Sequence, residues 1–177
     1  MLRYAAPAIV FAGMVAMFYF ALGRDPGELP SPYLGKPAPQ FELPRVKDPS
    51  ATIGSADYAG QTVLVNIWAT WCVGCRQEHD FLLQLANSNA IPIIGINWRD
   101  QRQEAITWLR QLGDPYVASG YDADGRVGID WGAYGAPETF LIGPDGTVLY
   151  KHISPLTQQV WEQEFVPRIE QVKQASL

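Results

Sequence analysis

The two cysteines of this chain, Cys72 and Cys75, lie three residues apart where an apolar segment gives way to a helical one. Residues 62–68 are β-branched and nearly all apolar, which predicts a buried central strand. Residues 76–85 have apolar side chains at helical spacing. A Cys-x-x-Cys pair at a helix start exposes its first sulfur and stabilises that thiolate. The spacing therefore predicts a redox-active dithiol in which Cys72 attacks and Cys75 resolves the mixed disulfide.

Other uses of a cysteine pair fit this sequence less well. A loop this short gains little stability from a static cross-link. A zinc site needs two more ligands, and the only histidines are His79 and His152. A haem attachment site needs a histidine directly after the second cysteine, where this chain has Arg76. We therefore expect neither a metal nor an organic cofactor.

Composition sets limits on the class of protein. The 177 residues are 47% apolar and 18% charged, which is enough apolar material for a packed core. This length predicts one domain plus terminal segments. The net charge is −5 and there is no basic run, so we expect no binding to nucleic acid.

The first 35 residues have the composition of an export segment followed by a tether. Residues 5–22 carry no charge, and this length is at the lower limit for a membrane span. We predict a single-pass transmembrane anchor over residues 1–22; the alternatives are a signal peptide cleaved after Gly23 and, less favoured, a buried helix of the fold. Residues 23–35 hold three prolines and three glycines, which predicts a linker. The domain over residues 36–177 would then be exported, in bacteria to the periplasm, where the dithiol can cycle.

The remaining segments predict an α/β domain. After the cysteines we expect a strand over 91–97, a helix over 101–112, a strand over 116–121, a hairpin with strands 139–142 and 148–153, and a helix over 157–172 capped by Thr157. Residues 38–60 are expected to add a further hairpin at the N-terminal end. Parallel strands with right-handed crossovers and an antiparallel edge give a mixed central sheet flanked by helices.

A second informative stretch is Gly-Ala-Pro-Glu-Thr at residues 135–139. Pro137 precedes a predicted strand, a position where cis X-Pro bonds occur in tight turns. A cis bond would place this backbone beside the cysteines. The residues alone leave the cis and trans forms open.

These features resemble the thioredoxin fold and, within it, the cytochrome c biogenesis thiol:disulfide interchange proteins of the CcmG/DsbE type. The matching segments are Leu-Gly-Lys-Pro-Ala-Pro (34–39), Val-Asn-Ile-Trp-Ala-Thr-Trp-Cys (65–72), Gly-Ile-Asn (95–97), Asp-Gly-Arg-Val-Gly-Ile-Asp-Trp-Gly (124–132), Tyr-Gly-Ala-Pro-Glu-Thr-Phe (134–140) and Tyr-Lys-His (150–152). These segments are spread over residues 33–157. Gly-Ala-Pro-Glu-Thr-Phe with Gly-Ile-Asn is more specific than Cys-x-x-Cys, and the resemblance implies a cis bond at Pro137.

The resemblance also implies a function. The chain would be a protein-disulfide reductase anchored in the bacterial inner membrane, with its domain facing the periplasm. It would reduce the Cys-x-x-Cys-His cysteines of apocytochrome c, or a haem-ligation partner, and a transmembrane thiol electron donor would reset it. The alternatives are another periplasmic thioredoxin-like reductant and a copper-binding chaperone that uses the cysteine pair. A peroxidase with Thr70 before its reactive cysteine fits less well, since the Cys-x-x-Cys spacing favours exchange.

Four residues are candidates for supporting roles. Trp71 would shield the disulfide, and Pro137 would lie against it. Glu78 lies one turn after Cys75, and Glu138 follows the proline. A buried carboxylate at either position would raise the pKa of the Cys72 thiol, and the family is similar in having acidic residues near its site. A solvated helix face is the alternative for Glu78.

Other residues are expected to have ordinary roles, and one position departs from the family. Trp98, Trp108, Trp131 and Trp161 are expected to pack in the domain, His79 to lie on a helix surface, and Arg126 and Asp130 to form an exposed loop pair. Family members often have Pro or Thr where this chain has Gly74. Residues between the cysteines tune thiolate stability, so we expect the reduction potential to differ from the family's by roughly tens of millivolts, in a direction the sequence does not give.

Overall fold

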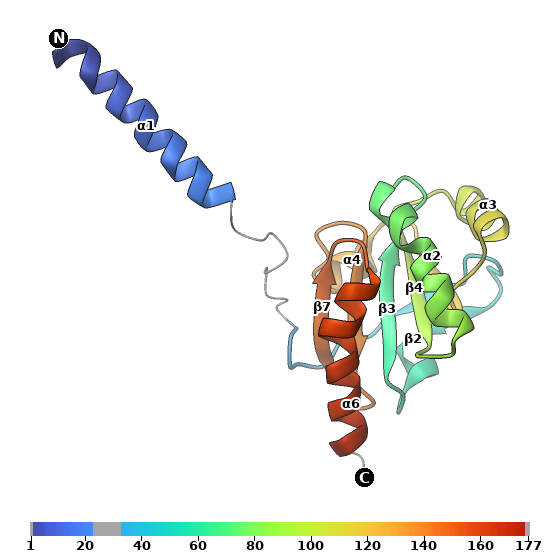
Figure 1. Cartoon of the computed structure of the whole chain (residues 1–177). Coiled ribbons are helices and arrows are strands. Elements are labelled where there is room, and N and C mark those ends of the chain that lie inside the picture. The colour runs from blue at the N-terminus through green and yellow to red at the C-terminus, as the bar shows by residue number, and fades with distance from the viewer. Residues whose placement is uncertain (1, 23–32, 176–177) are drawn as a thin grey trace.

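A five-stranded mixed sheet forms the centre of the domain, in the order β5-β4-β3-β6-β7. Figure 1 labels β4, β3 and β7 of this sheet. The computed structural model describes residues 2–22 and 33–175. The strands are β3 (Val63–Trp68), β4 (Ile93–Trp98), β5 (Ala118–Asp122), β6 (Glu138–Ile142) and β7 (Val148–Ile153). The β3-β4 and β4-β5 pairs are parallel, whereas β6 pairs antiparallel with both β3 and β7. The predicted strands and the mixed, thioredoxin-like sheet are confirmed, with ends that differ by one or two residues.

The helices after β3 and β4 are also confirmed. These are α2 (Val73–Asn87) and α3 (Arg102–Leu112). α2 begins three residues before the predicted start because the Cys72 sulfur accepts a hydrogen bond from the Cys75 N–H at 3.0 Å and caps the helix. The second cysteine therefore lies within the first turn of the helix.

Two segments differ in detail from the prediction. Arg126 and Asp130, expected in a loop, begin and end the short helix α4 (Arg126–Asp130), whose Gly128 N–H donates to the Asp122 carboxylate at 2.8 Å. The C-terminal helix is confirmed in extent but is made of α5 (Gln158–Val160), a π-helical turn η3 (Trp161–Phe165) and α6 (Val166–Ala175). The Thr157 cap is confirmed, since its hydroxyl accepts from the Val160 N–H at 3.3 Å.

The predicted N-terminal hairpin is present and supports one edge of the sheet. β1 (Glu42–Pro44) and β2 (Thr52–Gly54) pair antiparallel, and the 3-10 turn η2 (Ser55–Tyr58) follows. The Val46 N–H donates to the Ser119 carbonyl at 2.8 Å, so the chain after β1 is joined to the edge strand β5. This contact protects an edge that would otherwise present unpaired backbone groups.

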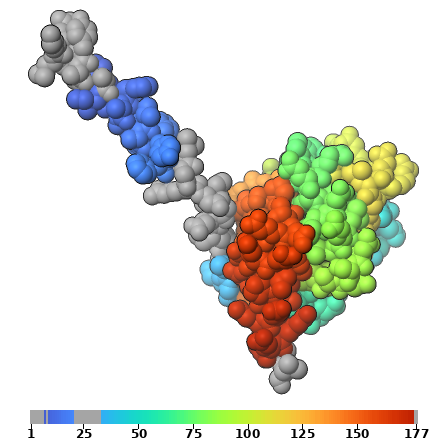
Figure 2. Space-filling view, in the orientation of Figure 1, coloured from blue at the N-terminus to red at the C-terminus, as the bar shows by residue number. Residues whose placement is uncertain are grey.

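Both faces of the sheet are covered by apolar side chains. On one face, α2, α3 and the C-terminal helix bury the cluster that contains Leu64, Trp68, Leu82, Trp108 and Phe165. α2 and α6 lie side by side on this face (Figures 1 and 2). The other face packs Val65, Ile67, Trp131 and Phe140 beneath the N-terminal hairpin. Trp98, Trp108 and Trp131 are buried as predicted, while Trp161 is half-buried.

The N-terminal segment forms α1 (Leu2–Leu22). Its side chains over residues 9–20 are exposed, so the alternative of a buried helix of the fold is wrong for those residues. Across the described parts of the chain, no helix reaches the combined length and apolarity that crossing a membrane requires. The predicted cleavage point at Gly23 and most of the predicted linker lie outside the described residues. The end of that linker is joined to the domain, since the Gly35 N–H donates to the Val148 carbonyl at 2.9 Å.

Candidate active site

The two cysteines form a disulfide at the C-terminal end of β3 and the start of α2. Their Cα atoms are 5.3 Å apart. The expectation that the Cys72 sulfur is exposed is wrong for this oxidised form, because Cys72 is only 4% exposed and Cys75 3%. The flanking Trp71 and Val73 are exposed instead, so a partner would meet these two side chains around a recessed disulfide.

The segment before Cys72 is fixed by Asp100, a residue that our sequence reasoning missed. Its buried carboxylate accepts from the Thr70 N–H at 2.7 Å and the Thr70 hydroxyl at 2.6 Å. The same carboxylate accepts from the Asn97 side chain and the Gln101 N–H, both at 2.8 Å. Four hydrogen bonds on one carboxylate tie the approach to Cys72 to the turn between β4 and α3.

Trp71, which directly precedes Cys72, contacts this same turn. Its indole N–H donates to the Arg99 carbonyl at 3.1 Å, and its ring centroid lies 6.3 Å from that of Trp98. More than half of the residue remains exposed. The indole is therefore fixed through its N–H, and the rest of the ring is accessible to a partner protein. Its shielding of the disulfide stays a prediction.

The second informative stretch lies against the cysteine loop. The Ala136-Pro137 bond is cis, as the resemblance implied. A Cβ atom added to Gly74 would stand 2.8 Å from the Pro137 Cδ and 3.2 Å from the Pro155 Cγ. Real Cβ atoms essentially never approach within 3.0 Å, so a side chain at position 74 would have to displace the Pro137 ring and press on the Pro155 ring. Gly74 thus allows Pro137 to approach the first turn of α2.

We expect Gly74→Ala to lower the stability of the oxidised domain by about 1 kcal/mol. Alanine favours a helix by about 1 kcal/mol over glycine, but overpacking against rigid rings costs about 1–3 kcal/mol. Disulfide exchange should also slow, because the Pro137 loop has to move. Urea unfolding and exchange kinetics measure both effects. Gly135→Ala is the matched control, since nothing lies within 4 Å of an added Cβ there; equal behaviour of the two variants would contradict the packing argument.

Glu78 is buried, so the alternative of a solvated helix face is wrong. It is 1% exposed on α2, one turn after Cys75. One carboxylate oxygen accepts from the Asn66 side-chain amide at 2.9 Å and the other from the Leu156 N–H at 2.7 Å. Burial raises the pKa of Glu78 to about 7, although both hydrogen bonds lower it. A buried carboxyl group with a raised pKa therefore lies on α2 one turn after the second cysteine.

A buried polar network extends from Glu78. Asn66 of β3 also donates to the Thr139 hydroxyl at 3.0 Å, and its carbonyl oxygen accepts from the Tyr116 hydroxyl at 2.9 Å. Burial raises the pKa of Tyr116, so it remains a donor. The sequence signal for this network is a single amide inside the apolar run 62–68, which we did not interpret.

Glu138 is buried as well, and its contacts are with the proline loop and a lysine. One of its oxygens accepts from the Tyr134 N–H at 2.7 Å and the Gly135 N–H at 3.1 Å. The other lies 2.9 Å from the Lys151 ammonium, which also donates to the Gly132 carbonyl at 2.9 Å. Glu138 therefore holds the loop before Pro137 against β7, and its predicted influence on the pKa of Cys72 stays a prediction.

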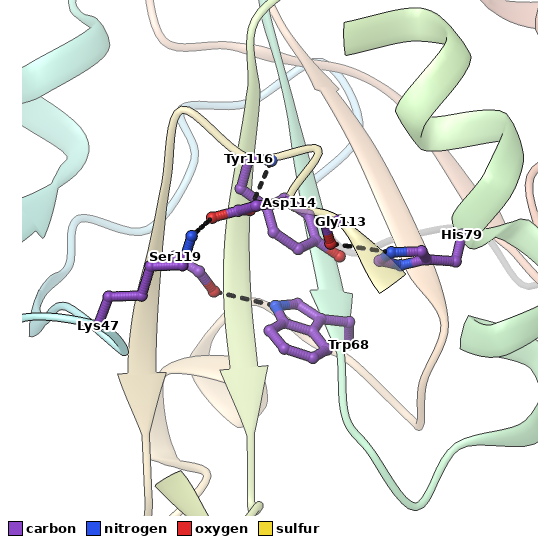
Figure 3. Close-up of polar contacts among 7 residues, drawn as sticks. All are labelled: Lys47, Trp68, His79, Gly113, Asp114, Tyr116 and Ser119. Atoms are coloured by element: carbon purple, nitrogen blue, oxygen red, sulfur yellow. Dashed lines mark hydrogen bonds and ion pairs between the residues drawn. The ribbon is translucent and has the colours of Figure 1, made fainter. Parts of the chain in front are cut away.

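His79 is buried, so its predicted place on a helix surface is wrong. It is 3% exposed and faces α3. Its Nε2 lies 3.1 Å from the Gly113 carbonyl (Figure 3), and the Trp108 indole N–H lies 3.3 Å from its Nδ1. Burial lowers the pKa of His79. Buried residues of α2 recur at positions 75, 78, 79, 82 and 85, so helical spacing could have placed this histidine inside.

Comparison with known proteins identifies the family. The model of the redoxin family matches residues 34–167. The chain is 45% identical over 165 residues to the thiol:disulfide interchange protein DsbE of Allochromatium vinosum, covering 93% of this chain and 91% of the relative. It is 44% identical to DsbE of Escherichia coli K12, over 91% and 90% of the two chains. The chain belongs to the redoxin family. Its DsbE-named relatives and its cysteine pair make it a thiol:disulfide oxidoreductase.

Solved structures support the redoxin fold. A DsbF homologue from Corynebacterium diphtheriae superimposes with a TM-score of 0.67 at 22% identity, over 84% of this chain and 96% of that one. The copper alternative would require further ligands beside the cysteines. Among residues 2–22 and 33–175, no three His, Cys, Asp or Glu side chains are grouped so that they could hold a metal ion.

Proposed function

We propose that this redoxin reduces the disulfide of a Cys-x-x-Cys-His motif in apocytochrome c, or in a haem-ligation partner, during c-type cytochrome maturation. The observation that carries the proposal is the Cys72–Cys75 pair at the start of α2, with the cis-Pro137 loop packed on it, in a chain 45% identical to a DsbE protein. The likeness of residues 134–140 to the CcmG/DsbE type supports the choice of substrate.

The location of this reaction is part of the same proposal. The uncharged run 5–22 supports an anchor in the bacterial inner membrane. Arg3 and the α-amino group before this run favour a cytoplasmic N-terminus, which supports a domain that faces the periplasm. A transmembrane thiol donor would then return electrons to the Cys72–Cys75 disulfide. Disulfides form and persist in an oxidising compartment, so the Cys72–Cys75 dithiol can be oxidised by its substrate there and reduced again by the donor in each cycle.

The exchange follows from the geometry of the pair. The Cys72 thiolate attacks one sulfur of the substrate disulfide, which breaks, and the other substrate sulfur leaves as a thiolate. Cys75 then loses its proton and attacks the Cys72 sulfur. This step forms the Cys72–Cys75 disulfide and releases the second substrate sulfur as a thiolate. Two electrons pass from the dithiol to the substrate, and protonation of both released thiolates completes the balance.

Glu78 is the group best placed to accept the Cys75 proton. Residues three apart on a helix are neighbours on one face, and both side chains are buried. A base is most effective when its pKa lies near the working pH, and burial raises the pKa of Glu78 to about 7. Glu78 would therefore act on the resolving step rather than on the attack by Cys72.

We expect Glu78→Gln to slow the resolving step roughly 100-fold at pH 7, the lower end for loss of a general base. In the wild type this rate should rise through about pH 7, and the variant should lose that inflection. The free energy of unfolding should fall as the pH rises through this range, whereas the rate of the resolving step rises. The neutral carboxyl is favoured in the fold, so the stability from this group is full below pH 4.5 and lost as the pH rises through about 7.

Rapid-mixing kinetics and urea unfolding from pH 4 to 9 check these expectations. Asp80→Asn is the control, because Asp80 is an exposed carboxylate on the same helix. An inflection near pH 7 that survives in Glu78→Gln would rule out Glu78 as the base.

The function is tested by the reduction potential of the pair and by its choice of substrate. A potential near or below roughly −200 mV supports a reductant, whereas one near roughly −120 mV would mean that the protein donates disulfides. The reduced protein is then mixed with an oxidised Cys-x-x-Cys-His peptide and with a scrambled peptide disulfide. Faster reduction of the first supports cytochrome maturation; equal rates would favour a general reductant.

A further inference from the structure

A groove of about 340 Å³ lies beside the disulfide and is separate from the Pro137 loop. Thr70, Trp71 and Arg76 line one side, and α3 lines the other with polar side chains that include Glu104. The buried Trp108 ring lies at its base. The groove begins at Trp71, the residue before the attacking cysteine, so a polypeptide whose disulfide reaches Cys72 also reaches this surface.

Arg76 places a positive charge at the edge of the groove. The residue is exposed, and its guanidinium carbon lies 4.2 Å from the centroid of the Trp108 ring. Within residues 2–22 and 33–175, no carboxylate forms an ion pair with it. Arg76 lies four residues after Cys72, and its N–H donates to the Cys72 carbonyl at 3.4 Å. A cation without an ion-pair partner among the described residues therefore stands one helical turn from the nucleophile, and Glu104 on the α3 side is the carboxylate of the groove itself.

The Trp108 ring that contacts the Arg76 guanidinium is held in place by a hydrogen bond to His79. The Trp108 indole N–H donates to Nδ1 of His79, and the protonated Nε2 of His79 donates to the Gly113 carbonyl (Figure 3 shows the second contact). This assigns a neutral histidine with its proton on Nε2, in keeping with its lowered pKa. Trp108 cannot turn without breaking a buried hydrogen bond, so the guanidinium stacks on a rigid face. A pre-organised cation loses less entropy when it binds a partner.

We infer that this groove binds the acidic segment of the protein substrate that adjoins the attacked cysteine, with Arg76 pairing to a substrate carboxylate. The inference rests on the proposed function, since it assumes a polypeptide disulfide. Arginine pairs well with carboxylates because its planar fork matches their geometry. One helical turn separates Cys72 and Arg76 by about 6 Å, and an extended chain advances about 3.3 Å per residue. The carboxylate should therefore lie two or three residues from the attacked cysteine.

The test uses peptide disulfides of identical composition and net charge. The near-Asp peptides carry Asp two or three residues from the reactive cysteine, on one side or the other. The far-Asp peptides carry Asp at the far end. The near-Lys peptides carry Lys near the cysteine. Formation of the mixed disulfide with Cys72 is followed by rapid mixing of the reduced full chain in detergent. We expect the near-Asp peptide on one side to react about tenfold faster than its far-Asp isomer, and the near-Lys peptide to react most slowly.

Variants of Arg76 separate local pairing from general electrostatics. Arg76→Gln should remove the difference between isomers, and Arg76→Glu should favour the near-Lys peptide. Ratios between isomers cancel any change in Cys72 reactivity, which affects all peptides alike. Arg110→Glu is the matched control, since Arg110 is an exposed arginine of α3 outside the groove lining. It should preserve the preference.

Each result decides between the proposals. Equal rates for the isomers, or a preference that survives in Arg76→Gln, would overturn the groove assignment and leave the proposed function standing. If no peptide forms an adduct with Cys72, the proposed function fails and the groove assignment fails with it. A wild-type dimer in sedimentation that Arg76→Glu dissociates would assign the groove to a second copy of the chain and also overturn the inference.

Discussion

Replacing Cys75 with serine should abolish turnover and convert the enzyme into a trap for its own substrate. Cys72 still attacks, but no neighbouring thiolate remains to break the mixed disulfide. We expect multiple-turnover reduction to fall by a factor of at least roughly 10³, while a covalent adduct accumulates at one equivalent per chain. Removing one member of a catalytic unit has effects of this order. Mass spectrometry of the adduct identifies the trapped sulfur as that of Cys72.

Cys72→Ser is the matched control for this trap. Cys72 caps α2, where the free N–H groups of the helix start favour a thiolate, whereas Cys75 lies inside the first turn. Cys75 should therefore not attack a protein disulfide, and no adduct should form. Stable adducts on Cys75 in that variant would reverse the assigned roles. Adduct formation on neither variant would place the chemistry outside this pair. With apocytochrome c as bait, the trapped species also tests the proposed substrate.

Much of the fold follows from local patterns. The apolar runs 62–68 and 91–97 predicted strands that are covered on both faces of a sheet. β3 and β4 are indeed inner strands of the sheet. The glycine and proline turn before Val148 predicted the hairpin of β6 and β7. Both cysteines were placed by their position between a strand and a helix. Such features depend on neighbours in sequence, which one chain displays directly.

The supporting side chains could not be assigned in this way, because their partners are distant in sequence. Asp100 contacts Thr70 thirty residues away, and Glu78 accepts from the backbone of Leu156 seventy-eight residues away. His79 and Glu78 are polar side chains on the face of α2 that also buries Leu82, and hydropathy alone placed His79 at the surface. Each of these groups is buried with hydrogen-bonding partners, which is the condition for a polar side chain to remain inside.

The buried pair of Glu138 and Lys151 gives the largest expected effect on stability. Their side chains are 1% and 2% exposed, and the ammonium lies 2.9 Å from the carboxylate. Lys151→Met should lower the free energy of unfolding by about 3–5 kcal/mol, because it leaves the Glu138 charge buried without a cation. Most of the loss should be recovered in the double variant Glu138→Gln, Lys151→Met, which buries no charge and retains an amide oxygen for the Tyr134 and Gly135 N–H groups.

Urea unfolding of the oxidised protein measures this effect, and an exposed pair supplies the comparison. Arg168 and Glu164 lie 3.0 Å apart with side chains 36% and 41% exposed, so Arg168→Met should cost about 1 kcal/mol or less. Since Glu138 also holds the loop before Pro137, Lys151→Met should slow disulfide exchange at temperatures where the domain is still folded. A cost for Lys151→Met no larger than that for Arg168→Met would show that the buried pair does not hold this loop.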